Sequence, residues 1–199
     1  MTDRSTDSAS DRLWYLMITV LVLIADQLTK YWVATSLQAR GDITVIKGLL
    51  TFSYTENRGI AFGMFNNENM QWFLVSISVA AIGVVVFYLL RSSASNRTLL
   101  VSLSLLAGGI GGNLIDRIRL GRVIDFIEVS YHSHYWPVFN MADTAISIGA
   151  ILLALDLFLS PHYAQKDAIG STPQPGGPTG AYAQEPASSS YTGEPPASV

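Results

Sequence analysis

Four long apolar segments limit what this chain can fold into more than any other feature. Each is long enough to cross a hydrocarbon layer of about 30 Å as an α-helix, and the second and third contain no charged residue. Only 14% of the residues are charged, against about 25% in a typical soluble domain. The sequence therefore predicts a mainly α membrane protein with four transmembrane helices, at about 13–36, 71–90, 98–115 and 142–159.

These spans divide the chain into one membrane domain and two tails. The domain covers 13–160 and includes two large loops, 37–70 and 116–141. Residues 1–12 are polar and residues 161–199 hold most of the prolines, so both tails are predicted to be disordered. Four spans place both termini on one side of the membrane and both loops on the other. Basic residues are evenly divided between the two sides, and only the N-terminal pair favours cytoplasmic termini.

Composition excludes several kinds of chemistry. The chain has no cysteine, which removes disulfides, thiolate metal sites and cysteine nucleophiles. Among its three histidines, His132 and His134 share one face of an extended segment, but two imidazoles without a third ligand make a poor zinc site. No cluster of basic residues indicates a nucleic-acid partner.

The first large loop has the composition of a small β-structure. Its β-branched and aromatic residues predict short strands at 43–46 and 49–55. The segment 57–63 then breaks the pattern, and its two glycines, Gly59 and Gly63, permit a positive φ or a close backbone approach. Such a segment is either an ordinary turn or an edge that pairs with an extended peptide.

Polar residues are concentrated between the third and fourth spans. Carboxylates beside a bilayer are energetically expensive and are functional candidates. The glycine-rich segment 108–112 lets helices approach closely and would turn the polar residues that follow it toward neighbouring helices. The candidates in this region are Asp116, Asp125 and Asp143, with Asn113, Arg117 and Asn140.

Local context separates these carboxylates into two groups. A neighbouring cation favours a carboxylate anion, so Asp116 beside Arg117 is interpreted as a structural anchor. Asp26 and Lys30 in the first span have the i, i+4 spacing of an ion pair and are interpreted in the same way. Asp125 has no such partner on its strand face.

Asp143 falls in the first turn of the fourth span, three residues after Asn140, as in a capping box. If Asp125 and Asp143 converge, they would share one proton, and we expect Asp125 to carry it more often. One carboxylate would activate water and the other would hydrogen bond to the developing oxyanion. The alternative is that Asp143 is only a helix cap and Asp125 only a residue at the end of a strand.

Five sequence blocks, in order, resemble the lipoprotein signal peptidase (signal peptidase II) family of bacterial membrane aspartyl peptidases. Each block alone is weak, but their order along four spans is specific, and the resemblance covers roughly residues 13–160. The blocks are Asp26-Gln27-Leu28-Thr29-Lys30, Asn57-Arg58-Gly59-Ile60-Ala61-Phe62-Gly63, the run from Gly108 to Arg117, Gly121-Arg122-Val123-Ile124-Asp125-Phe126, and Phe139-Asn140-Met141-Ala142-Asp143.

The resemblance implies that Asp125 and Asp143 form the catalytic dyad. It also implies that further residues bind substrate or support the dyad: Asp26, Lys30, Asn57, Gly59, Asn113, Asp116, Arg117 and Asn140. The implied substrate is a diacylglyceryl-modified prolipoprotein, cut just before the lipidated cysteine, with no metal or organic cofactor. The implied inhibitor is a cyclic peptide of the globomycin type.

The resemblance further implies a monomer in membrane lipid of the bacterial inner membrane. The dyad would then lie near the extracytoplasmic face, and the strands of the first loop would form a small extracytoplasmic β-cradle over the scissile bond. Two other classes of function stay open: a transporter or proton channel, and a non-enzymatic assembly factor. The channel is disfavoured because the acidic residues cluster at one membrane face instead of running through its depth.

Overall fold

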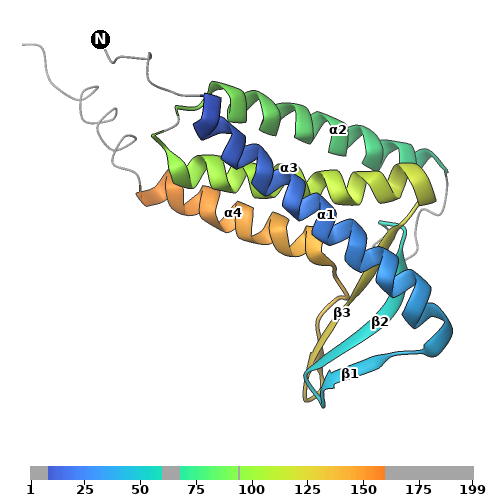
Figure 1. Cartoon of the computed structure of the whole chain (residues 1–199). Helices are drawn as coiled ribbons and strands as arrows, with labels where there is room; N and C mark the ends of the chain where they lie inside the picture. The colour runs from blue at the N-terminus through green and yellow to red at the C-terminus, as the bar shows by residue number, and fades with distance from the viewer. Residues whose placement is uncertain (1–8, 60–67, 94, 160–199) are drawn as a thin grey trace, which may run out of the picture. The chain divides into compact units, whose positions relative to one another are not determined.

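The computed structural model describes residues 9–59, 68–93 and 95–159. Within these ranges it contains four helices that are long and apolar enough to cross a membrane, which confirms the predicted spans. Figure 1 shows the helices packed together with a β-sheet at one end. Their bounds are α1 Ala9–Arg40, α2 Glu68–Arg91, α3 Arg97–Leu120 and α4 Met141–Leu159.

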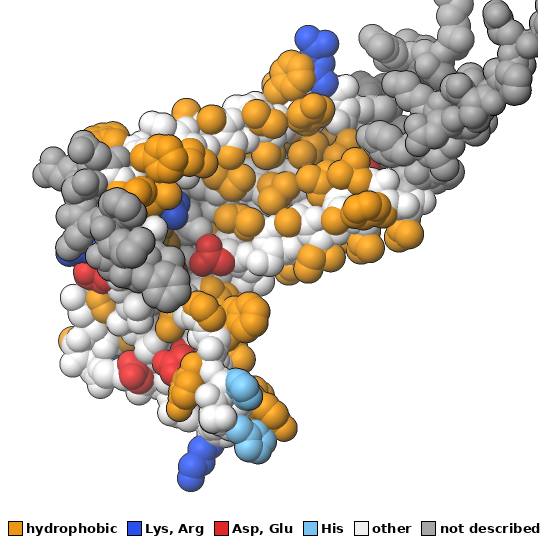
Figure 2. All heavy atoms as spheres, turned by 180° about the vertical axis from the view of Figure 1, so that it is seen from behind, with side chains coloured by type: hydrophobic (Ala, Val, Ile, Leu, Met, Phe, Trp, Pro, Cys, Tyr) orange, Lys and Arg blue, Asp and Glu red, His pale blue; other side chains and the backbone are white. Residues whose placement is uncertain are grey.

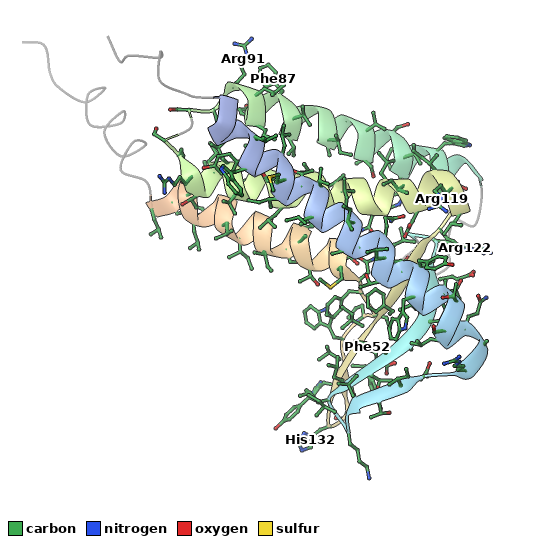
Figure 3. The ribbon with its side chains drawn as sticks, viewed as in Figure 1. Phe52, Phe87, Arg91, Arg119, Arg122 and His132 are labelled. Carbon is green, nitrogen blue, oxygen red and sulfur yellow. The ribbon has the colours of Figure 1, made fainter. Side chains whose placement is uncertain are left out.

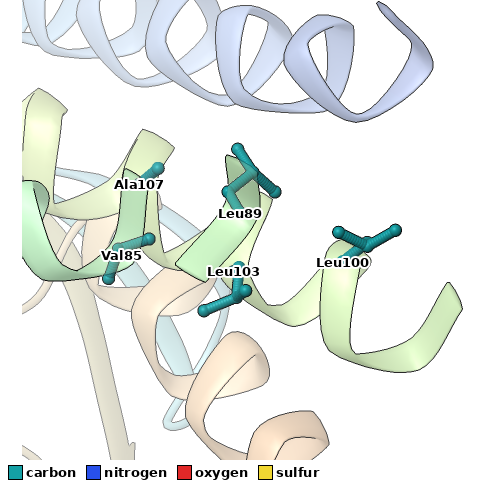
Figure 4. Packing of buried hydrophobic residues seen from close by; sticks show 5 residues of the cluster. All are labelled: Val85, Leu89, Leu100, Leu103 and Ala107. Carbon is teal, nitrogen blue, oxygen red and sulfur yellow. The ribbon is translucent and has the colours of Figure 1, made fainter. Parts of the chain in front are cut away.

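Helix α3 is the centre of the bundle. It packs against α1, α2 and α4, and 56% of its span is buried, against 11–22% of the other three spans. Figure 4 shows the apolar cluster between α2 and α3, formed by Val85, Leu89, Leu100, Leu103 and Ala107. Figure 2 shows hydrophobic side chains over an outer face of the helices, as expected for lipid contact, with acidic side chains mainly where the helices meet the sheet and on the sheet.

The glycine-rich segment of α3 brings three helices close together, as predicted. A Cβ atom at Gly108 would meet Val22 of α1, and one at Gly109 would meet the backbone carbonyl of Ala142 in α4. Because these positions have no side chain, the backbone of α3 lies directly against both neighbours. This close approach sets the distances between polar groups on α1, α3 and α4.

Two of the predicted helices are shorter than the helices in the structure. Helix α1 begins at Ala9 and continues to Arg40, beyond the expected 13–36, so the start of the first loop is helical. Helix α3 continues past residue 115 and ends where Gly121 adopts φ 71°, its N–H bonded to the carbonyl of Arg117 at 3.1 Å. The expected loop boundary at 116 followed the first charge, but a charged residue does not end a helix, whereas a left-handed glycine does. The other parts of the expected tails, 1–8 and 160–199, lie outside the described residues.

Two loops combine into one antiparallel sheet with the strand order β1-β2-β3-β4. The strands are β1 Ile43–Ile46, β2 Leu50–Asn57, β3 Val123–Tyr131 and β4 His134–Tyr135. The expected strands at 43–46 and 49–55 are confirmed, and β2 extends to Asn57. In the register, Asn57 lies opposite Val123 and Thr55 lies opposite Asp125. This pairing brings the end of the first loop beside the candidate aspartate on β3.

Aromatic packing fixes the sheet against the end of α1. Val33 and Leu37 of α1 are buried with Ile124 and Phe126 of β3. Phe52, labelled in Figure 3, stacks edge-on with Trp32 at 6.2 Å and with Phe126 at 6.1 Å between ring centroids. Each such pair contributes about 0.5–1.5 kcal/mol beyond its buried area. The sheet is thus anchored at the end of the bundle where the polar cluster lies.

Candidate functional site

Asp143 and Asn140 form the capping box that the sequence predicts at the start of α4. The Asp143 N–H donates to Asn140 Oδ1 at 2.9 Å, and the Asn140 N–H donates to Asp143 Oδ2 at 3.3 Å. The other oxygen of Asp143 accepts a hydrogen bond of 2.7 Å from Asn113 Nδ2 of α3. Two donors and the helix N-terminus therefore hold this half-buried carboxylate in one orientation.

Asp125 projects from β3 into the same cluster and is almost completely buried, with 1% of its surface exposed. Its Oδ1 accepts a hydrogen bond of 2.6 Å from Asn140 Nδ2, and its Oδ2 accepts one of 2.8 Å from Asn57 Nδ2. Asn140 therefore contacts both candidate aspartates: its amide nitrogen bonds to Asp125 and its carbonyl oxygen caps Asp143. The structure thus brings together the two carboxylates that the sequence selects.

Burial raises the pKa of Asp125 from 3.8 to about 6. The hydrogen bond from Asn57 lowers this pKa, the charge of Asp143 raises it, and the hydrogen bond from Asn140 and the charge of Lys30 lower it. Arg122 does not join the site, because its Nε lies 3.1 Å from Glu56 Oε2. That pairing agrees with the expectation that Asp125 has no cationic partner on its own strand face.

Lys30 is the buried cation of the site, with 2% of its surface exposed. Its ammonium lies 2.9 Å from Asp26 Oδ2, which confirms the predicted ion pair. It also lies 2.9 Å from Asp116 Oδ2 and donates to Asn113 Oδ1 at 2.9 Å. All three N–H groups of Lys30 therefore have a partner, on α1 or α3.

The prediction that Arg117 anchors Asp116 is wrong, because Lys30 is the cation that pairs with Asp116. Successive residues on a helix point in different directions, so Asp116 and Arg117 cannot face one another. Arg117 donates weakly to the carbonyl of Asn113, at 3.4 Å. Its guanidinium lies within electrostatic range of Asp143, Asp116 and Asp125.

The two anchoring carboxylates also hold the backbone next to the candidate dyad. Asp26 Oδ1 accepts the N–H of Ala142 at 2.9 Å, one residue before Asp143. Asp116 Oδ2 accepts the N–H of Ile124 at 3.3 Å, one residue before Asp125. Lys30 is therefore linked through Asp26 to the backbone before Asp143, and through Asp116 to the backbone before Asp125.

Gln27, for which the sequence predicts no separate role, is also a member of this network. Its Nε2 lies 3.2 Å from Asp26 Oδ2, 3.1 Å from Asp116 Oδ1 and 3.2 Å from the carbonyl of Gly112. The sequence feature that indicates a buried partner for Gln27 is its position beside Asp26 in an apolar span. Gln27 adds a second link between the two carboxylates that flank Lys30.

Asn57 is oriented by the turn that follows β2. Its Oδ1 accepts the N–H of Gly59 at 2.7 Å, which leaves Nδ2 directed at Asp125. Gly59 has φ 75°, so the expected positive φ is confirmed at this glycine. The rest of the segment, residues 60–63, lies outside the described residues.

Within the described parts of the chain, no group of three or more histidine, cysteine or acidic side chains is arranged to hold a metal ion. His132 and His134 are exposed on the hairpin between β3 and β4. Figure 3 shows His132 at the tip of the sheet that points away from the helices.

Taken together, these features define a four-helix membrane protein with a buried cluster of carboxylates and amides at one end of its bundle. A family model described as signal peptidase (SPase) II matches residues 18–159, a range that includes every polar residue of the cluster. The chain therefore belongs to the signal peptidase II family, and the resemblance stated from its motifs is confirmed. It is a membrane peptidase of a family that removes signal peptides from lipoproteins.

Individual relatives agree with this assignment. A lipoprotein signal peptidase of Clostridium tetani is 43% identical over 152 residues, which cover 76% of this chain and 96% of that protein. One from Pseudomonas fluorescens is 40% identical over 159 residues, covering 78% and 94% of the two chains. A solved structure of a bacterial membrane enzyme superimposes with a TM-score of 0.67 at 32% identity, covering 73% of this chain and 93% of that one.

Proposed function

We propose that the chain is an intramembrane aspartyl endopeptidase that cuts diacylglyceryl-modified prolipoproteins just before the lipidated cysteine. The observation that carries this proposal is the position of Asn140, which hydrogen bonds to both Asp125 and Asp143. A residue that only capped a helix would not need its amide nitrogen on a second, buried carboxylate. The shared amide instead favours a pair of aspartates that act together on one bond.

The proposed reaction uses the two carboxylates in different protonation states. Asp143 takes a proton from water, whose oxygen adds to the scissile carbonyl carbon, while protonated Asp125 hydrogen bonds to the carbonyl oxygen as it gains negative charge. The tetrahedral intermediate then collapses and the C–N bond breaks, and the proton on Asp143 passes to the leaving amine. The products are the carboxylate of the signal peptide and the free amino group of the lipidated cysteine. A pKa of about 6 for Asp125 makes its protonated form accessible near neutral pH.

The supporting residues hold this pair in place. Asn57, oriented by Gly59, and Asn140 fix the carboxylate of Asp125, and Asn113 fixes that of Asp143. Lys30, Asp26 and Asp116 neutralise one another in part and hold the adjoining backbone. Arg117, which is attracted to both dyad carboxylates, would offset their negative charge during the reaction.

The site lies at one end of the helix bundle, and this end can be assigned to one face of the membrane. The cluster lies at the end of the bundle that carries the sheet (Figure 1), and we place this end at the extracytoplasmic face of the bacterial inner membrane, with both termini cytoplasmic. The sheet would act as a cradle over the scissile bond. We further propose that the protein acts as a monomer in membrane lipid and is inhibited by cyclic peptides of the globomycin type.

The test is cleavage of a synthetic lipidated preprolipoprotein by the purified protein, with the products identified by mass spectrometry. We expect one cut before the lipidated cysteine, sensitivity to globomycin, and loss of cleavage in Asp125→Asn and Asp143→Asn. Asp156→Asn is the matched control, because Asp156 lies near the other end of α4 and bonds to Asn96. Cleavage by a folded Asp143→Asn variant would reject the dyad.

A further inference from the structure

A groove of about 450 Å³ begins at Asp143 and lies outside the hydrogen-bonded network of the site. One wall is the segment 136–139 that leads into α4, and the other is the α4 face with Thr144, Ser147 and Ile148. The first wall is fixed to the sheet, because the N–H and carbonyl of Phe139 both bond to the backbone of β3. The groove therefore has two firm walls and the candidate catalytic carboxylate at its head.

The lining indicates an apolar ligand without charge. Asp143 is the only charged residue among the described residues that line it. The Thr144 hydroxyl already bonds to the carbonyl of Asn140 at 3.0 Å, which leaves its methyl group for contact. Beyond Ile148, the exposed face of α4 continues with Ile151 and Leu155, which are 60% and 46% exposed. The groove is thus continuous with a surface that faces lipid.

Its size distinguishes between the apolar parts of the proposed substrate. An α-helix is about 10 Å wide with a pitch of 5.4 Å, so a volume of this order holds roughly one helical turn. The groove therefore encloses no more than about one turn of a membrane-spanning signal peptide. Acyl chains are narrower, and in the proposed substrate they are attached to the residue directly after the scissile bond, a few atoms from the reacting carbonyl. Their first carbons would lie in the groove and the rest in the lipid beyond Ile148.

We propose that this groove is the subsite for the acyl chains of the lipidated cysteine. The inference rests on the proposed function, because the chemistry of that substrate is what places acyl chains beside the dyad. Acyl chains leave one hydrocarbon environment for another when they enter it, so the groove gains little from the hydrophobic effect. Its contribution is to orient the lipid, and through it the cysteine and the scissile bond, relative to Asp143.

Photo-crosslinking tests the occupant directly. The Asp125→Asn variant in lipid nanodiscs would be given the lipidated substrate with a diazirine either in an acyl chain or in the signal peptide. A third sample would carry the diazirine on bulk phospholipid. We expect the acyl probe to label 136–139 and 144–148 more than the phospholipid probe does, and the signal-peptide probe to label other residues.

Labelling of the groove by the signal peptide, or acyl labelling no stronger than that of bulk phospholipid, would overturn the proposal. A separate cleavage assay with the unsubstituted protein keeps the two hypotheses apart. Absence of cleavage there rejects the proposed function, whereas cleavage combined with acyl labelling elsewhere rejects only the subsite.

A pair of substitutions on α4 gives an independent test. Ser147→Phe fills the groove, and Leu155→Phe adds the same ring farther along the exposed face, outside it. We expect Ser147→Phe to lower kcat/KM about tenfold for a dipalmitoyl substrate and much less for a dibutyryl one, since 1.4 kcal/mol of lost orientation is tenfold. Leu155→Phe should leave both values near those of the unsubstituted protein. The test requires that Ser147→Phe keeps the Tm of the unsubstituted protein. In such a variant, an equal loss for both chain lengths, or no loss, would contradict the subsite.

Discussion

The ammonium of Lys30 on α1 lies 2.9 Å from the carboxylate of Asp116 on α3, and this contact joins the two halves of the candidate site. Asp116 holds the backbone before Asp125, whereas Asp26, the other ion partner of Lys30, holds the backbone before Asp143. One buried cation therefore sets the position of both candidate catalytic residues without touching either. The arrangement explains why an apolar span tolerates a lysine and an aspartate.

Lys30→Met should destabilise the fold and abolish cleavage. The substitution leaves Asp26 and Asp116 buried and close together without their cation, and breaking a buried ion pair in this way costs about 3–5 kcal/mol. The measurement is the Tm of the purified protein in detergent together with the cleavage rate. Lys47→Met is the control, because Lys47 is exposed in the turn between β1 and β2 and should be replaceable without effect. Equal Tm values for the two variants would show that Lys30 does not stabilise the site.

Asn140→Ser separates the two roles of Asn140. Serine caps helices about as well as asparagine, so α4 should begin normally and the protein should still fold, with a Tm lowered by the loss of the buried amide hydrogen bonds. Serine cannot place an amide nitrogen on Asp125, and leaving a buried acceptor without its partner costs about 1–3 kcal/mol. We expect cleavage to fall roughly 10- to 100-fold with the fold intact, as measured by kcat/KM and circular dichroism. Full activity in this variant would mean that Asn140 acts only as a cap.

Asn57→Ala should change the pH dependence of cleavage. In the proposed reaction Asp125 is protonated, so activity falls as pH rises through its pKa of about 6. The hydrogen bond from Asn57 stabilises the anion and lowers this pKa; its removal therefore raises the pKa and moves the alkaline limb of the profile upward, by roughly one pH unit. The measurement is kcat/KM against pH.

The control for this shift is Tyr54→Phe, which removes a hydrogen bond from Tyr54 to Glu56 on the same strand and leaves Asp125 untouched. Its pH profile should match that of the unsubstituted protein. A downward shift of the alkaline limb in Asn57→Ala would be incompatible with a protonated Asp125 in the reaction.

Features within one helix or turn are predictable from the sequence, because few degrees of freedom separate their residues. The i, i+4 spacing predicts the Asp26–Lys30 pair, and the three-residue spacing predicts the box of Asn140 and Asp143. The pairing of Lys30 with Asp116 instead depends on how α1 and α3 are rotated toward one another, so a local reading assigns Asp116 the wrong cation.

The contact between Asn57 and Asp125 depends on strand register. Asn57 reaches Asp125 because it lies opposite Val123, and that pairing joins two loops separated by two membrane helices. No hairpin turn joins β2 to β3, so no local turn fixes this register. The motif resemblance identifies Asn57 as a residue of the site, but its contact with Asp125 is seen only in the folded chain.

Gly112→Ala tests whether the close approach of α3 to α1 is required by the ion cluster. A Cβ atom at Gly112 would collide with the carboxylate of Asp26, which is held by Lys30 and by the N–H of Ala142 and has little room to move. Overpacking of this kind costs about 1–3 kcal/mol, and displacement of Asp26 would also shift the start of α4 and Asp143. We therefore expect a lower Tm and a large loss of cleavage.

Gly83→Ala on α2 is the matched control, because nothing lies within 4 Å of a Cβ there. The better helix propensity of alanine should leave that variant as stable as the unsubstituted protein or about 0.5–1 kcal/mol more stable. If both variants cleave at the rate of the unsubstituted protein, the position of Asp26 does not control the dyad.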